Sequence, residues 1–373
     1  MACTKKKQIV NRNNDGVNEQ GSSAILLSDN INEYVRSLSH VVDFVHVVDN
    51  ARRVQVMQAA NVIPIKLPAT NISEFWTTYI LKNKITTIYA QGRKSLWMFA
   101  RIMKKIKIPP RIIVTCHNSS VLENTFKTFV FLLSARFFSH GVVFLSKRSF
   151  RKWHFFCQCI GLPSWNLPNP VELERFPIIE RTNASTEIVI GSIGAMLRDK
   201  GQHIILNALS ILISKGYNIK VKLAGGDGDI NFKNDLIKFT QMSQLTERVE
   251  WMGEIKYDKI PCFLKMIDLY VCSSYREVMP FSILEAMASG LPIVASDIAG
   301  IPDLVCDDEN GYVVQVGRAD LLAEAIEKII IGKMFTQFGK NSRHLAEKRF
   351  SCETIAPFMK QILLGSPMSQ VVN

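Results

Sequence analysis

The amino-acid sequence predicts an α/β protein with two doubly wound parallel sheets in separate domains. Short stretches rich in β-branched residues alternate with helix-like stretches along most of the chain, a pattern typical of parallel sheets covered by helices. The chain has 373 residues, 47% of them hydrophobic, which is more apolar material than one ordinary domain needs. Residues 166–187 are rich in proline and polar side chains and separate two alternating series, so we interpret them as a linker.

The expected elements follow from these stretches. In the first half, we expect buried strands at 41–49, 85–92, 111–118 and 141–146, with helices at 71–84, 95–108 and 124–139. In the second half, we expect strands at 187–194, 219–226, 248–255, 268–274, 291–297 and 311–317, with helices at 201–216, 234–244, 281–289 and 319–331. We expect the two Rossmann-like domains to face each other across a cleft. Sheets of this kind bind ligands at the carboxyl ends of their strands, so the candidate site lies in the loops that follow strands.

Charge is unevenly distributed along the chain. Residues 1–179 carry 24 Lys and Arg against 10 Asp and Glu, whereas residues 180–373 carry 21 against 23. The first half therefore has a net charge of +14 and the second of −2, which indicates an acidic partner for the first: a phosphorylated substrate, an anionic membrane or nucleic acid. Nucleic-acid binding has no support beyond charge, so we do not expect it.

Residues 126–156 combine cations with aromatic side chains and contain no acid. The cations are Lys127, Arg136, Lys147, Arg148, Arg151 and Lys152, and phenylalanines and Trp153 lie between them. A basic surface with exposed aromatics can dock on an anionic leaflet, and we favour this over the alternative that the phenylalanines belong to the core. We find no transmembrane run and no signal peptide, and scattered cysteines fit a reducing compartment, so we expect a cytoplasmic, peripheral membrane protein.

The segment REVMPFSILEAMASGLP (276–292) places two acids around a helix start after a strand. Ser282 and Glu285 fit a capping box, which would give Glu285 a structural role, and Gly290 and Pro292 mark the helix end. Glu277 has no comparable role. The backbone N–H groups from Met279 to Ile283 suit a phosphate or sugar oxygen, and carboxylates accept hydrogen bonds from hydroxyls, so the segment suits a sugar nucleotide.

Three other loops follow strands. The loop after Gly194 carries Arg198 and Lys200, cations that suit a diphosphate or, alternatively, a solvated turn. Asp227-Gly-Asp229 is a possible metal clamp, but we favour an ordinary turn. His117 follows a first-domain strand, where it is either structural or faces the site.

These motifs together resemble the GT-B glycosyltransferases of family 4, the retaining "group 1" enzymes. The resemblance rests on the two glutamates eight residues apart, the following EAMASGLPIV and the later Asn310-Gly311, together with LPNPVELERF, GSIGAMLRDKGQ and LAGGDGD. It covers about residues 165–315 well and the first half loosely. It implies an acceptor domain at 1–177, a nucleotide-sugar domain at 178–350, and a helix at 351–365 that packs back on the first domain.

The resemblance also implies roles for individual residues. Glu285 would bind the ribose hydroxyls and Glu277 the donor sugar. Lys200 would neutralise the diphosphate, and His117 would lie near the transferred sugar. The remaining donor-binding residues would be Gly194, Arg198, Met279, Pro280, Phe281 and Ser282.

The sequence departs from the family pattern at three places. Ala195 stands where the family has its phosphate-binding arginine, a role that Arg198 would have to take over. The paired glycines of the first loop are replaced by the separated Gly16 and Gly21. Pro280 removes one N–H group from the phosphate cradle.

The function implied by the resemblance is retaining transfer of a sugar from a nucleoside-diphosphate-sugar donor to a growing glycan or lipid-linked acceptor, without a metal cofactor. The setting would be lipopolysaccharide, O-antigen or capsule biosynthesis at the inner membrane face. Two alternatives remain open: a catalytically inactive sugar-nucleotide or glycan-binding module, and a sugar-nucleotide epimerase on the same architecture.

Overall fold

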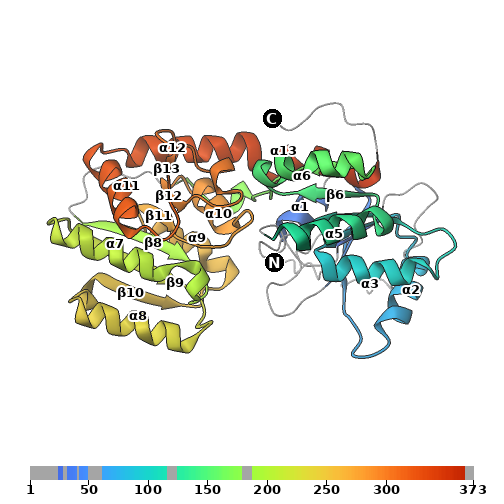
Figure 1. Ribbon diagram of the computed structural model, residues 1–373, viewed down its shortest axis with the longest axis horizontal. Helices are drawn as coiled ribbons and strands as arrows, with labels where there is room; N and C mark the ends of the chain where they lie inside the picture. Colours follow the sequence, from blue (N-terminus) through green and yellow to red (C-terminus); the bar gives the residue numbers. More distant parts are fainter. Residues whose placement is uncertain are drawn as a thin grey trace, which may run out of the picture.

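The computed structural model describes residues 24–27, 32–39, 42–48, 61–115, 124–178 and 187–365, and the structural statements below concern these residues. It confirms the predicted fold class. Two α/β domains lie side by side, each built on a parallel sheet with helices on both faces (Figure 1).

The first sheet has seven strands in the order β3-β2-β1-β4-β5-β6-β7. They are β1 (Ala24–Leu27), β2 (Phe44–Val48), β3 (Val62–Ile65), β4 (Thr87–Gln91), β5 (Arg111–Thr115), β6 (Gly141–Phe144) and β7 (Ser164–Asn166). The buried side chains of α2 (Ile72–Lys82), α3 (Arg93–Met103), α5 (Thr125–Phe138) and α6 (Lys147–Cys159) belong to the cluster on one face. Those of α1 (Asn32–Ser39) and α13 (Cys352–Leu364) belong to the cluster on the other face.

The second sheet has six strands in the order β10-β9-β8-β11-β12-β13. They are β8 (Ile188–Ile193), β9 (Ile219–Ala224), β10 (Val249–Gly253), β11 (Leu269–Cys272), β12 (Ile293–Ser296) and β13 (Gly311–Val314). Helices α7 (Gln202–Ser214), α8 (Ile230–Met242) and α11 (Ala319–Ile331) cover one face, and α9 (Ile260–Lys265) and α10 (Phe281–Ala288) the other. All six strands lie within their predicted ranges.

The sequence reading missed several elements and misplaced one helix start. It did not predict α6, although residues 147–159 form a regular helix capped by Ser146, whose hydroxyl accepts from the Ser149 N–H. The alternating cations and aromatics of this segment obscured its helical period. Helix α8 begins four residues before the predicted start, because Asp229 caps it.

The carboxyl edges of the two sheets face each other. Strand β6 ends at Phe144, and Arg148 soon after it forms an ion pair with Asp297, which directly follows β12, at 2.6 Å. In addition, the Lys147 N–H donates to the Asp303 carboxylate at 2.7 Å. Because neighbouring strands in each sheet are parallel, the loops after β8 and β11 also lie on the edge that faces the first domain.

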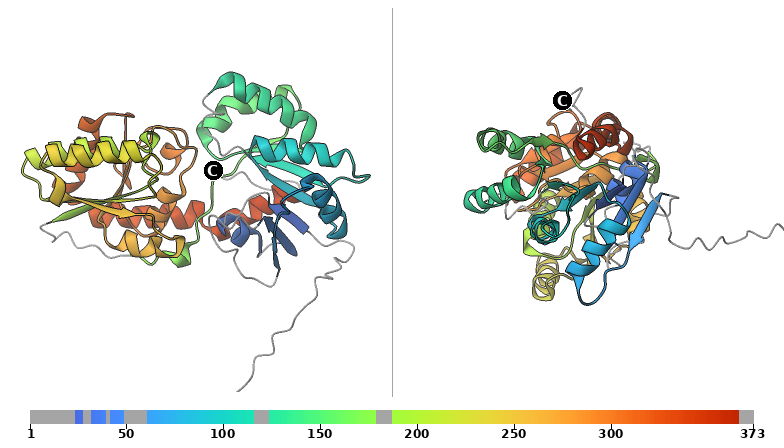
Figure 2. Two further views of the ribbon diagram at one scale, coloured as in Figure 1. Left: turned by 90° about the horizontal axis from the view of Figure 1, so that it is seen from below. Right: turned by 90° about the vertical axis from the view of Figure 1, so that its right-hand side faces the viewer.

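The chain connects the domains twice. After the first sheet it passes through Val171 into the second domain, and it returns through α12 (Phe335–Leu345), the π-helical turn Ala346–Phe350 and α13. The two connections bond to each other: the Val171 N–H donates to the Phe350 carbonyl at 2.7 Å, and the Cys352 N–H to the Val171 carbonyl at 3.1 Å. Figure 2 shows the red end of the chain lying against both domains. Helix α13 thus completes the first domain's core, as the Thr87 hydroxyl bond to the Leu363 carbonyl also shows.

Candidate functional site

The loop after β8 and the loop after β11 are bonded together at the edge facing the first domain. Gly201 has a φ of +70°, and a Cβ on it would lie 2.1 Å from the Ser273 carbonyl oxygen, so only glycine permits this approach. The Ser273 hydroxyl donates to the Gly201 carbonyl at 2.8 Å, and the Tyr275 N–H to the Asp199 carbonyl at 2.7 Å. The two loops therefore form one rigid unit.

This unit brings Lys200 and Glu277 together, although 77 residues separate them. The Lys200 Nζ donates to the Glu277 Oε1 at 2.6 Å, and the Ser274 hydroxyl donates to the same oxygen at 3.2 Å. Both side chains are partly buried. A cation and a carboxylate at this edge can contact a diphosphate and a sugar hydroxyl, respectively.

Glu285 lies on α10 and is only 4% exposed. The predicted capping box is wrong: Pro280 occupies the N-cap position without a side-chain cap, and Ser282 is the second residue of the helix. Ser282 instead hydrogen-bonds Tyr270, whose hydroxyl accepts from the Ile193 N–H at 3.3 Å. Burial raises the pKa of Tyr270 well above its usual value, and the nearby Glu285 raises it further. Glu285 therefore does not form the predicted capping box, and its carboxylate is buried within α10.

The start of α10 supplies free backbone donors. The first N–H groups of a helix have no intrahelical acceptor, which here applies to Phe281, Ser282 and Ile283. Pro280 contributes no N–H, as expected. Met279 packs between the domains: its carbonyl accepts from the Asn169 side-chain amide at 2.7 Å, and its sulfur accepts from the Asn169 N–H at 3.2 Å.

Gly194 and Arg198 lie in the loop after β8, before Lys200. The Gly194 N–H donates to the Ala224 carbonyl at 2.8 Å, and a Cβ on Gly225 would lie 2.0 Å from the Gly194 oxygen, which packs the loop tightly against the turn after β9. Arg198 is exposed, and its guanidinium lies over the Phe232 ring of α8 at 5.2 Å. A role for Arg198 at a diphosphate requires its side chain to leave this ring.

The Asp227-Gly-Asp229 segment is the turn that leads into α8. Asp229 caps α8 by accepting from the Asn231 and Phe232 N–H groups, and Asp227 pairs with Lys233 at 2.6 Å, so the turn interpretation holds. His117, Gly16 and Gly21 lie outside the described residues.

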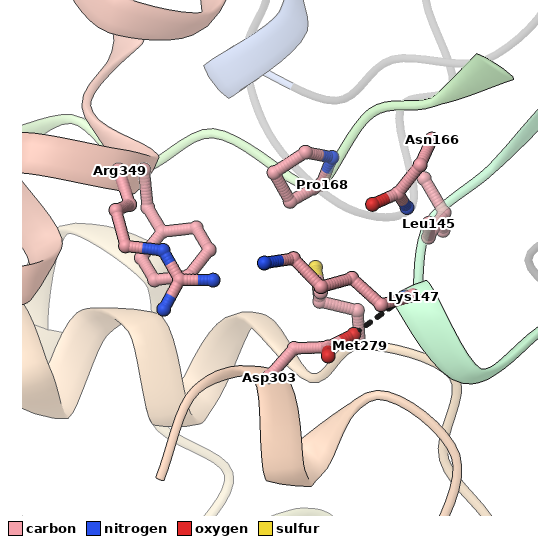
Figure 3. A pocket seen from close by; sticks show the side chains of 8 residues that line it. Leu145, Lys147, Asn166, Pro168, Met279, Asp303 and Arg349 are labelled. Carbon is pink, nitrogen blue, oxygen red and sulfur yellow. Dashed lines mark hydrogen bonds between the residues drawn. The ribbon is translucent and has the colours of Figure 1, made fainter. Parts of the chain in front are cut away.

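A narrow crevice lies between the domains, where the sequence predicts a cleft. Its lining includes Lys147 from the first domain, Pro168 from the linker, and Met279, Asp303 and Arg349 from the rest of the chain (Figure 3). Burial raises the pKa of Asp303, an effect that the bond from the Lys147 N–H and the nearby cations oppose. Figure 3 shows the Lys147 side chain extending into the crevice toward Arg349.

The basic run 126–156 divides between surface and interior. Phe126, Phe137 and Phe155 are 75%, 77% and 74% exposed, whereas Trp153 is only 6% exposed and belongs to the core. Two of the six cationic residues contact the second domain: Arg148 through its ion pair with Asp297, and Lys147 through its backbone N–H. Within the described ranges, no helix is both long and apolar enough to span a membrane.

Residues 175–345 match the family model "Glycosyl transferases group 1". The capsular polysaccharide biosynthesis glycosyltransferase CapM of Staphylococcus aureus is 30% identical over 172 residues, 45% of this chain and 43% of its own. An Escherichia coli UDP-Gal:alpha-D-GlcNAc-diphosphoundecaprenol alpha-1,3-galactosyltransferase is 28% identical over 189 residues, 48% of each chain. The chain thus matches somewhat less than half the length of these relatives.

Solved structures resemble nearly the whole chain. Sucrose-phosphate synthase from Thermosynechococcus elongatus covers 91% of this chain and 98% of its own with a TM-score of 0.75 and 18% identity. Anabaena HepE in complex with UDP-glucose covers 92% and 100% with a TM-score of 0.73 and 19% identity. The two domains together therefore have the GT-B fold, and the group 1 match is confined to residues 175–345.

Proposed function

We propose that the chain transfers a sugar from a nucleoside-diphosphate-sugar donor to a growing glycan or lipid-linked acceptor. The observation that carries this proposal is the arrangement at the edge facing the first domain: the Lys200–Glu277 pair beside the start of α10, with Glu285 buried in the same helix. The group 1 family match covers all of these residues, and two of the relatives are named for capsule and lipid-linked glycan synthesis.

The donor would be held by complementary charge. As the bond between the sugar carbon and the diphosphate breaks, negative charge grows on the leaving diphosphate. Lys200 and the N–H groups at the start of α10 stabilise this charge, so we propose that the reaction needs no metal cofactor. Glu277 accepts hydrogen bonds from the donor sugar, and Glu285 from the ribose hydroxyls.

We propose that the anomeric configuration is retained. Glu277 is bonded to Lys200 and Ser274, an arrangement that suits binding of sugar hydroxyls better than nucleophilic attack. The acceptor hydroxyl would therefore attack from the face that the diphosphate leaves. The departing diphosphate takes the acceptor's proton while the new bond to the sugar carbon forms.

Donor turnover by the purified protein tests the proposal. A panel of UDP-, GDP- and ADP-sugars is incubated with and without lipid-linked and glycan acceptors, in buffer with and without a chelator. We expect one donor to be consumed in an acceptor-dependent way, unaffected by the chelator, and proton NMR of the product to show retention. Donor conversion without any acceptor dependence would instead indicate the epimerase.

Matched variants connect turnover to the site. We expect Lys200→Ala and Glu277→Ala to lower turnover about 10²- to 10³-fold, the usual effect of removing a group that stabilises developing charge. Lys215→Ala is the control, since Lys215 forms a 2.6 Å ion pair with Glu327 at the far end of α7. Equal losses in all three variants would contradict the assignment.

An inactive nucleotide-binding module is the second candidate, and Ala195 is the observation that favours it. Alanine stands where the family has a phosphate-binding arginine, and Arg198 lies over Phe232. Nucleotide binding measured by thermal shift, without transfer or hydrolysis of any donor in the panel, would support this candidate.

We further propose that the first domain docks on the anionic inner face of the plasma membrane. Between Phe75 and Val171 the only acid is Glu123, against 15 lysines and arginines. The exposed rings of α5 and α6 would enter the headgroup region while Lys127, Arg136, Arg151 and Lys152 contact lipid phosphates. Binding to anionic liposomes should weaken as salt is added, and equal binding to neutral vesicles would contradict an electrostatic dock.

A further inference from the structure

A buried asparagine in the linker bonds to both domains at once. Asn169 is 1% exposed. Its Oδ1 accepts from the Tyr34 hydroxyl of α1 at 2.5 Å, and its Nδ2 donates to the Met279 carbonyl at 2.7 Å. Its backbone N–H also points to the second domain, donating to the Met279 sulfur at 3.2 Å.

The chemistry of this contact requires an amide. The Met279 carbonyl can only accept, so the side chain of Asn169 must present its NH₂ group there and its oxygen to Tyr34. A carboxylate has no donor for the carbonyl, and a smaller side chain leaves buried polar groups without partners. Asparagine is therefore chemically specified at this position rather than merely tolerated.

The two residues that bond to the Asn169 side chain, Tyr34 and Met279, make or adjoin contacts near the proposed donor site. The Tyr34 ring packs edge-on against Tyr89 of β4, with centroids 5.7 Å apart, and against Phe281 at the start of α10, with centroids 6.5 Å apart. Met279 lies two residues after Glu277 and two residues before Phe281, where α10 begins. The first-domain helix α1 thus contacts the donor-binding segment both directly and through Asn169.

We infer that Asn169 is a positioning residue, which fixes residues 277–281 relative to the first domain. This inference rests on the proposed function, because the fixed segment is the one that would hold the donor. Asn169 itself would touch neither donor nor acceptor. Its effect is to keep the donor sugar aligned with an acceptor bound by the first domain, so it should influence turnover more than nucleotide affinity.

Asn169→Asp tests the inference, because it preserves shape and removes one donor. At pH 8 the introduced carboxyl is charged and cannot donate to Met279, so we expect turnover to fall about tenfold while the nucleotide Kd changes less than twofold. Protonation at lower pH restores a donor and should bring turnover back toward that of the wild type. Burial at this position raises the pKa of the introduced carboxyl, an effect that Lys147 and Arg349 in the adjoining crevice oppose, so the profile extends down to pH 5 (Figure 3).

Asn166→Asp is the matched control. Asn166 lies three residues earlier, and its side-chain amide donates to the Phe144 carbonyl within the first domain at 3.0 Å. We expect its pH profile to follow that of the wild type. Acid recovery in both variants, or in neither, would overturn the positioning role of Asn169.

Hydrogen exchange separates this inference from the proposed function. In Asn169→Asp at pH 8, amides of residues 277–284 should exchange faster than in wild type and in Asn166→Asp, whether or not any donor is turned over. Tyr34→Phe, which removes only the hydroxyl, should produce a smaller increase in the same peptide. Unchanged exchange in a folded Asn169→Asp protein would refute the inference, even if the protein is an active transferase.

Discussion

The first half of the chain carries its excess of positive charge, a net +14 over residues 1–179, whereas residues 180–373 have a net charge of −2, although both halves are built on parallel sheets. In the second domain, the features that point to function lie inside, at the strand ends: Lys200, Glu277 and the buried Glu285. In the first domain they lie outside, on α5 and α6. The family match covers residues 175–345 and leaves most of the first domain unmatched. The two sites that we propose therefore differ in their residues and not in the architecture that carries them.

The strongest test of the second domain's rigidity is Gly201→Ala. The added Cβ would meet the Ser273 carbonyl oxygen at 2.1 Å in a residue with φ +70°, so we expect a loss of at least about 3 kcal/mol in the free energy of unfolding. Gly216→Ala is the control, since its φ of +88° is similar but no atom lies within 4 Å of the added Cβ, and it should cost about 1 kcal/mol. Urea denaturation measures both. Similar losses would show that the loops are not held together as described.

The surface contrast between the domains predicts where a membrane binds. Replacing Phe126, Phe137 and Phe155 together by serine should weaken binding to anionic liposomes about 100-fold, because three exposed rings would no longer enter the interface. Met242 and Ile331 are 86% and 68% exposed on the second domain, and their replacement by serine is the control. Co-sedimentation measures the difference. A loss in the control variant as large as in the triple variant would remove the contrast.

The first domain should also respond to acid through His46. Burial lowers the pKa of His46 to about 4, from an ordinary value of 6.5, and Tyr79 bonds its Nδ1 at 2.9 Å. Between these two values the unfolded chain binds a proton that the folded chain does not, so stability falls as pH falls through this window, by about 2 kcal/mol at pH 4.5. His46→Gln should lose less stability between pH 7 and 4.5 than wild type. The exposed His344 of the second domain provides the control, and His344→Gln should behave as wild type.

The smallest expected effect concerns the ribose contact. We expect Glu285→Gln to weaken nucleotide binding about tenfold, equivalent to about 1.4 kcal/mol, because an amide presents one acceptor oxygen instead of two. Isothermal calorimetry measures the affinity, and the unfolding midpoint shows whether the buried site remains intact. Unchanged affinity would show that Glu285 has only a structural role and that Lys200 and the start of α10 bind the donor without it.

Local patterns predicted the second domain well. The sequence predicts a helix at 319–331, and α11 spans Ala319–Ile331. It also predicts that Gly290 marks a helix end, and Gly290, with φ +73°, lies two residues after the last residue of α10. These signals depend on residues within one or two turns of each other. They include the apolar period and the residues that begin or end a helix.

The sequence does not predict which contacts form between segments that lie far apart along the chain. Lys200 and Glu277 are both predicted as site residues, but the sequence does not predict their ion pair, because it depends on how parallel strands place two separate loops. Asn169 was read as part of a polar linker, since nothing near it in sequence indicates that Tyr34 and Met279 meet there. Trp153 was expected on the surface, because the charged residues around it conceal which side of α6 faces the sheet.

The return of the chain through α12 to α13 has a consequence for how the protein is made. Ile355, Met359, Ile362 and Leu363 fill one side of the first domain's interior, and the ribosome adds them only after the whole second domain. During synthesis, the second domain can therefore reach its final form while the first still exposes an uncovered apolar wall. We expect nascent chains stalled before residue 352 to bind chaperones through the earlier-made half, the reverse of the usual order in which the leading domain is finished first.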